Sequence, residues 1–188
     1  MESILDIGLT GEFEDGKAKI IGKTCFESET IEMIIWRLKS ETGEFFYLRE
    51  MLLKGEEDED DEVLYDLLSE VDPDDKRTFE EIANDVFSDW KCFAEVTIEN
   101  NIKAISSEGK TGDLPLKKSV VKMADVFYED EESDYMLEED DILADFCIMW
   151  NTDSTWVFCI EGFEEDEIAE IFGLDSEEPE EEEEEKDK

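Results

Sequence analysis

Two apolar runs flank a short polar turn in the region from Ile142 to Phe163. Apolar runs of this length on both sides of a turn predict two antiparallel strands, in which successive side chains point to opposite faces. Acidic residues lie on both sides of the region, at 129–141 and 164–167. We therefore predict a β-hairpin over 142–161 at the centre of the fold, with a charged exterior.

Two registers of this hairpin place the even-numbered apolar residues of both strands on one inward face. A register that pairs Phe146 with Ile160 leaves a three-residue loop at 152–154 and sets Cys147 opposite Cys159. A register displaced by two residues keeps the same inward face and separates the cysteines. Both registers predict that Asp145 and Glu161 face water or a polar layer.

Three further segments have strand character. Residues 17–26 predict a first strand, and alternation over 92–107 predicts a second hairpin. There, Asn100 and Asn101 can supply a left-handed turn residue. The region 31–53 fits either a helical stripe or two strands around the turn at 40–43, and we favour the hairpin.

Apolar residues at helical spacing predict the remaining elements. The predicted helices cover 63–71, 78–90, 116–127 and 164–172. Thr78 and Glu81 form a capping-box pattern at the start of the second, and Gly173 is a typical stop for the last. The predicted fold class is α+β, with an antiparallel sheet built from hairpins (about 92–107 and 142–161) and packed with three to four helices.

Two parts of the chain differ in composition. Residues 1–174 are predicted to form a single acidic domain, because 40% of the chain is apolar and 11% is aromatic, which is enough for a core. Residues 175–188 are almost entirely acidic and are predicted to be a disordered tail. With 59 acidic and 17 basic residues, the net charge of the chain is −42. The tail contributes −8 of this, so the acidity is not a property of the tail alone.

Several classes of enzymatic site are not supported by the residue types present. The sequence contains no histidine, which excludes Ser-His and Cys-His nucleophiles as well as histidine-ligated metals. The four cysteines have no metal-ligand spacing and are interpreted as reduced, packed residues. The segment 56–67 lacks the glycine and the final glutamate of a calcium loop, since Asp61 and Leu67 occupy those positions.

Paired carboxylates could in principle support acid–base catalysis. Asp140, Asp141, Asp145 and Glu161 lie near the central hairpin, but in so acidic a chain a solvated face is the simpler interpretation. No glycine-rich phosphate loop is present. We predict that the protein is not an enzyme and has neither a cofactor nor a dedicated metal site.

The start of the chain is acidic and resembles no signal peptide, and no apolar run is long enough to span a membrane. A cytoplasmic location without membrane association is the resulting expectation.

The negative charge is the main indication of function. It should repel nucleic-acid phosphates, so the expected partner is a basic protein rather than nucleic acid itself. We predict a non-enzymatic acidic domain that binds a basic protein surface, as a nucleic-acid mimic or an inhibitor of a DNA- or RNA-binding protein. The alternatives are an immunity protein that neutralises a basic toxin, an acidic chaperone for basic proteins, and adaptation to high salt.

The segment 129–141 is the predicted partner-binding site, because it embeds aromatic and methionine side chains in acid, as in many protein-binding hot spots. The alternative is that these apolar side chains attach the segment to the core. The predicted partner-binding residues are Asp130, Glu131, Glu132, Asp134, Tyr135, Met136, Glu138, Glu139, Asp140 and Asp141.

Overall fold

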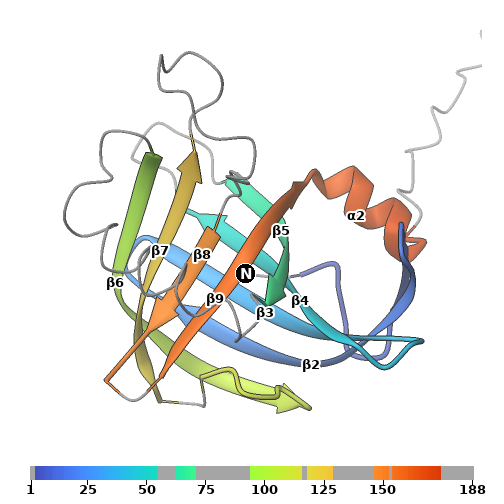
Figure 1. Ribbon diagram of the computed structural model, residues 1–188, viewed down its shortest axis with the longest axis horizontal. Coiled ribbons are helices and arrows are strands. Elements are labelled where there is room, and N and C mark those ends of the chain that lie inside the picture. Colours follow the sequence, from blue (N-terminus) through green and yellow to red (C-terminus); the bar gives the residue numbers. More distant parts are fainter. Residues whose placement is uncertain are drawn as a thin grey trace, which may run out of the picture.

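The computed structural model describes residues 3–54, 62–70, 94–115, 118–128, 146–152 and 154–174, with the backbone alone at 62, 94–100 and 126–128. These residues form one antiparallel sheet of nine strands and one helix (Figure 1). The elements are β1 (Thr10–Phe13), β2 (Gly16–Glu27), β3 (Ile31–Ser40), β4 (Phe45–Leu53), β5 (Glu62–Glu70), β6 (Ala94–Gly109), β7 (Val120–Tyr128), β8 (Phe146–Trp150), β9 (Thr155–Phe163) and α2 (Glu165–Phe172).

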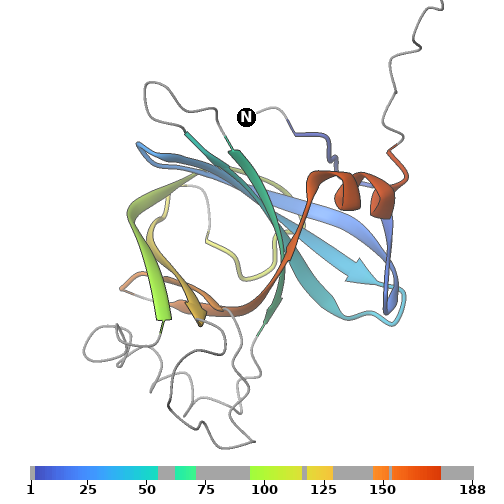
Figure 2. The same cartoon turned by 90° about the horizontal axis from the view of Figure 1, so that it is seen from above.

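Eight of the strands close into a barrel. Strands β2 to β5 form one meander and β6 to β9 form another, with each strand antiparallel to its neighbours. Pairing of β5 with β9 joins the two meanders on one side, and pairing of β2 with β6 joins them on the other. Figure 2 shows the resulting ring of strands, with α2 outside it. The short strand β1 pairs with the first part of β2.

Two glycines allow β2 and β6 to approach closely where the barrel closes. A Cβ atom on Gly109 would lie 2.4 Å from the carbonyl oxygen of Ile21, and its φ of +71° is itself unfavourable for other residues. A Cβ atom on Gly22, which pairs with Gly109, would lie 2.6 Å from the backbone of Lys110. The closure therefore depends on the absence of side chains at both positions.

A bulge in β2 changes which of its residues face the inside of the barrel. The pairing with β3 shifts between Ile20 and Gly22, so that even-numbered residues change from the outer to the inner face of the barrel. Ala18 and Ile20 consequently pack outside, whereas Thr24 and Phe26 are fully buried on the inner face.

The inner core fills the barrel, and the outer core lies between the barrel wall, α2 and the segment that precedes β1. The outer core contains Trp36, Leu48 and Tyr65 from the wall, with Ile168 and Phe172 from α2. The inner core includes Phe26, Met33, Ile35, Tyr47, Met51, Leu68, Ile102, Val121, Met123, Met149 and Phe158. Strands β3 to β5 are thus buried on both faces.

The α+β prediction with three to four helices is wrong, because the described chain is a β-barrel with the single short helix α2. The segments 63–71 and 116–127, predicted as helices, contribute strands β5 and β7. In β7, Val121 and Met123 lie on the inner face, and Ala124 on the outer face is buried as well. Burial on both faces produces a continuous apolar run, which also matches helical spacing.

The hairpin predicted over 92–107 is also wrong. Its two halves belong to one continuous strand, β6, which pairs with β7 from Ala94 to Lys103 and with β2 from Lys103 to Gly109. Asn101 does adopt the left-handed conformation, with φ of 64°, but at a bulge between Glu99 and Ile102 instead of a chain reversal. The left-handed residue therefore marked a break in regular strand pairing, but it did not show whether that break is a turn or a β-bulge.

The central hairpin is confirmed by the pairing of β8 with β9, but both predicted registers are wrong. Phe146 pairs with Cys159, and Cys147 pairs with Phe158, so the two cysteines are neither paired nor on the same face. Cys147 and Met149 face the inner core in β8, where even-numbered residues were expected to do so. Ile148, on the opposite face, is 4% exposed, so both faces of β8 are buried. The apolar pattern therefore did not show which residues of β8 face the barrel interior.

Other predictions are confirmed. The strand predicted at 17–26 corresponds to β2, and the hairpin at 31–53 corresponds to β3 and β4, which are joined by residues 41–44, one residue beyond the predicted turn at 40–43. The last helix is α2, which ends at Gly173 in the left-handed conformation. The helix predicted at 78–90 and the disordered tail predicted at 175–188 lie outside the described residues.

Candidate functional site

Arg49 lies at the centre of the barrel interior and binds two carboxylates. Its position in β4 points inward, between the buried residues Tyr47 and Met51, and its side chain is 1% exposed. Nε and Nη2 of Arg49 donate to Oδ2 of Asp66 at 2.8 and 2.7 Å. Nη1 donates to Oδ1 and Oδ2 of Asp125 at 2.7 and 2.8 Å. These three residues, from β4, β5 and β7, are named the interior ion cluster.

The interior ion cluster carries two carboxylates for one guanidinium. Burial raises the pKa of Asp66, an effect that the charge of Arg49 opposes. Removal of charges from water is costly, and opposite charges offset the cost only where hydrogen bonds satisfy them, as here. The cluster ties together strands from both meanders of the barrel, since β4 and β5 belong to one and β7 to the other.

Two sulfur atoms complete the surroundings of Arg49. Its Nη1 lies 3.4 Å from Sγ of Cys147 and 3.8 Å from Sδ of Met123. Burial raises the pKa of the Cys147 thiol well above its ordinary value, and Asp125 raises it further. A thiol with a raised pKa is protonated at neutral pH and is therefore a poor nucleophile.

Glu50, the neighbour of Arg49, is buried on the outer face of the barrel. Its Oε2 accepts hydrogen bonds from Oγ of Ser3 at 2.5 Å and from Nε1 of Trp36 at 3.0 Å. The hydroxyl of Tyr65 lies 3.5 Å from Oε1, and burial together with the charge of Glu50 raises the pKa of Tyr65. This carboxylate attaches the segment before β1 to the wall of the barrel.

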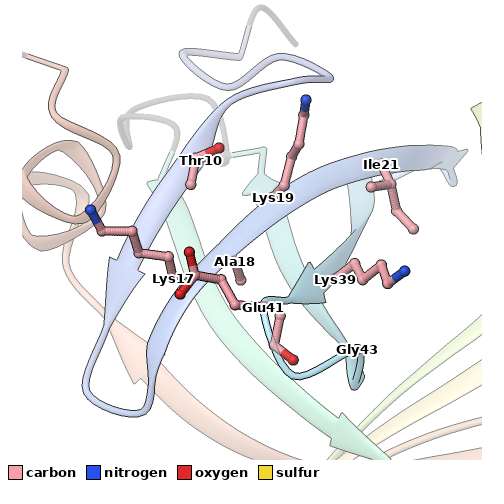
Figure 3. A pocket seen from close by; sticks show the side chains of 9 residues that line it. Thr10, Lys17, Ala18, Lys19, Ile21, Lys39, Glu41 and Gly43 are labelled. Carbon is pink, nitrogen blue, oxygen red and sulfur yellow. The ribbon is translucent and has the colours of Figure 1, made fainter.

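A surface groove of about 380 Å³ lies beside the start of β2 (Figure 3). Lys17, Lys19 and Lys39 surround it, and their side chains extend in different directions from its floor (Figure 3). All three lysines are exposed. The remaining lining residues are Thr10, Ala18, Ile21, Ser40, Glu41 and Gly43. These nine residues are named the lysine groove.

The negative charge is distributed unevenly along the chain. The described residues contain 24 acidic and 11 basic residues, a net charge of −13. The rest of the chain contains 35 acidic and 6 basic residues, a net charge of −29. Most of the acidity therefore belongs to segments that connect to the barrel rather than to the barrel itself.

Two of these segments connect at neighbouring strand ends. Residues 71–93 precede Ala94, and residues 129–145 follow Tyr128, and these two residues pair directly between β6 and β7. The two segments carry seven and ten acidic residues. Two segments with 17 acidic residues between them are therefore attached at adjacent strand ends.

The predicted partner-binding residues Asp130 to Asp141 all lie outside the described residues, as does Asp145. Glu161 is exposed in β9, as predicted. The sequence interpretation missed Arg49, Asp66 and Asp125. Each is a charged residue within an apolar strand (YLREM, LYDLL and MADVF), and that interruption is the signal that could have identified them.

In the part of the chain that the structure describes, no cluster of three or more potential metal ligands occurs. The described helix is too short and too polar to cross a bilayer. No protein-family model, curated protein or solved structure matches this chain.

Proposed function

We propose that this protein is a non-enzymatic, acidic binding domain that engages a basic surface of another protein. The observation that carries the proposal is the division of charge between a barrel of −13 and connected segments of −29. A field of this size steers a basic partner toward the protein and increases the association rate.

The barrel suits the role of a scaffold. Its interior is filled by apolar side chains and by the interior ion cluster, so its stability does not require a ligand in the interior. Closure gives each of its eight strands two neighbours, which protects the strands from pairing with other chains. A rigid support of this kind can present acidic segments at fixed points.

The partner class that fits best is a protein that binds nucleic acid, because its cleft is built to attract a dense array of negative charges. Occupation of that cleft would make this protein an inhibitor that mimics nucleic acid. Neutralisation of a toxin and chaperoning of basic proteins use the same electrostatics and are distinguished by selectivity.

The test compares two charge-matched variants of the full chain. One replaces the nine acidic residues of 129–141 by Asn and Gln, and the other replaces nine acidic residues of 175–185 in the same way. Basic proteins of the source cell, enriched on heparin, are passed over each immobilised chain and eluted with a NaCl gradient. Captured proteins are then tested for competition with DNA.

The proposal expects a small set of captured proteins, steep loss of binding with salt, and much weaker capture by the 129–141 variant. A protein displaced by DNA would identify a mimic, and a single toxin would identify an immunity protein. Equal weakening of both variants toward every basic protein would indicate non-selective polyelectrolyte binding. Unchanged capture by both variants would refute the proposal.

A further inference from the structure

The lysine groove is a locally basic feature of a strongly acidic protein. Among the described residues, Lys17 has one carboxylate within reach, that of Glu12 at 3.9 Å, whereas Lys19 and Lys39 have none within 4.0 Å. Lys39 instead lies 5.8 Å from the ring centre of Phe45. The ammonium groups are therefore largely available to an external anion.

The arrangement of the three lysines favours an extended anion over a compact one. Lys19 and Lys39 are directly paired between β2 and β3, and Lys17 is two residues from Lys19 on the same strand. Their side chains diverge around the groove (Figure 3), so no single small anion is surrounded by all three. A chain of carboxylates can meet each lysine in turn.

The acidic segment 175–188 is attached on the face of β1 opposite to this groove. It follows α2 directly, and Leu174 packs in the outer core. Helix α2 lies against β1, because a Cβ atom on Gly11 would be 2.8 Å from Cγ2 of Ile171. The next residue back along β1, Thr10, points to the opposite face, pairs with Lys19 and lines the groove, so the segment would reach the groove around the edge strand β1.

The composition of that segment complements the groove. Its 14 residues include ten acidic residues and two lysines. An extended chain of this length reaches about 45–50 Å, so distance does not limit contact with the groove. Because the attachment is covalent, the local concentration of the segment at the groove is on the order of millimolar.

We propose that the acidic segment 175–188 docks in the lysine groove of its own chain. Repulsion by the rest of the protein acts over about 8–10 Å at physiological ionic strength, so the charges that line the groove dominate the field that the segment meets. These are the three lysines and Glu41, and their sum is positive. Individual exposed ion pairs are weak, and it is the attachment that makes the contact persist. Docking would shield the groove from other anions and hold this segment away from the partner.

The inference is independent of the proposed function, since it concerns a contact within one chain. It is tested on the full chain by carbodiimide coupling, which joins a lysine amine to a carboxylate in contact with it. Coupled peptides are mapped by mass spectrometry at low protein concentration. We expect links from 175–188 to Lys17, Lys19 and Lys39, and few to the exposed control lysines Lys103, Lys118 and Lys122.

A second measurement compares acylation rates of the same lysines. Neutralisation of the acidic residues of 175–185 should raise the rates at the three groove lysines by at least about threefold, as expected for a contact formed most of the time. The control lysines should change little, and added NaCl should reproduce the effect of neutralisation.

Three results would overturn the inference. Links from 175–188 distributed equally over groove and control lysines would indicate non-selective attraction. Links that appear only between chains would assign the groove to a second copy. Links from the groove lysines to the acidic residues of 56–62 or 129–141 instead would identify a different occupant.

Discussion

Replacement of Arg49 by methionine should strongly destabilise the fold. The substitution keeps an unbranched side chain in the barrel interior but removes the guanidinium from between Asp66 and Asp125. Four hydrogen bonds of 2.7–2.8 Å are lost, and two buried carboxylates remain without a counter-charge. The cost arises mainly from those uncompensated carboxylates and not from the net value of the ion pairs.

The magnitude follows from the burial of the cluster. Arg49 is 1% exposed, and the side chains of Asp66 and Asp125 are 12% and 5% exposed, so water does not replace the lost partner. Removal of one member of such a pair costs about 3–5 kcal/mol. For a chain of this size that corresponds to a fall in Tm of roughly 6–20 °C. The cost should decrease toward pH 5, because burial raises the pKa of Asp66 and protonation then removes its uncompensated charge.

The assay is urea unfolding followed by tryptophan fluorescence, since urea leaves the ionic strength unchanged. Arg37→Met is the matched control: Arg37 has no carboxylate within 4.0 Å among the described residues, and it stacks 4.1 Å from the ring centre of Phe45. We expect that variant to lose at most about 1 kcal/mol.

A triple variant separates charge from packing. Arg49→Met combined with Asp66→Val and Asp125→Val removes the whole cluster, and it should be at least about 2 kcal/mol more stable than Arg49→Met alone. If Arg49→Met costs no more than the Arg37 control, or if the triple variant is the least stable of the set, the electrostatic account of the barrel interior is incorrect.

Three further outcomes are expected. Burial raises the folded-state pKa of Asp66 above its unfolded value near 4. The contribution of this carboxyl to the free energy of unfolding therefore falls as pH rises through the folded-state pKa. In urea unfolding, the stability of Asp66→Asn relative to the unsubstituted protein should therefore be higher at pH 7 than at about pH 4, and an equal difference at both pH values would contradict the raised pKa. Gly109→Ala should cost about 2–4 kcal/mol, because its Cβ would lie 2.4 Å from a carbonyl oxygen, while Gly43→Ala, also at positive φ but in open space, should cost about 1 kcal/mol. Since a net charge of −42 opposes compaction, added NaCl should raise Tm, and a Tm insensitive to salt would show that the acidic residues do not repel one another appreciably.

The hairpins at 31–53 and 142–161 were predictable because their turns interrupt two apolar runs with short polar segments. The terminal helix was predictable because an exposed amphipathic helix preserves its periodicity and ends at a glycine. In both cases the information is local to the segment. It does not depend on what the segment contacts.

Strands β5 and β7 were predicted as helices because they contribute side chains to two buried layers, and their apolar positions no longer alternate. The register of β8 against β9 was missed for the same reason, since Cys147 and Ile148 are both buried although they point to opposite faces. Where both faces of a strand are apolar, the sequence does not show which face points into the barrel.

The sequence alone therefore determined a strongly acidic chain with an apolar core, two of its turns and its terminal helix, because each depends on residues adjacent along the chain. The tertiary structure decided the closure of β2 on β6, the bulge that exchanges the faces of β2, and the meeting of Arg49 with Asp66 and Asp125. The closure pairs Gly22 with Gly109, and the barrel interior brings Arg49 to Asp125, so that each pair joins residues more than 70 positions apart. Only the closed barrel brings such distant residues together, so local patterns could not reveal them.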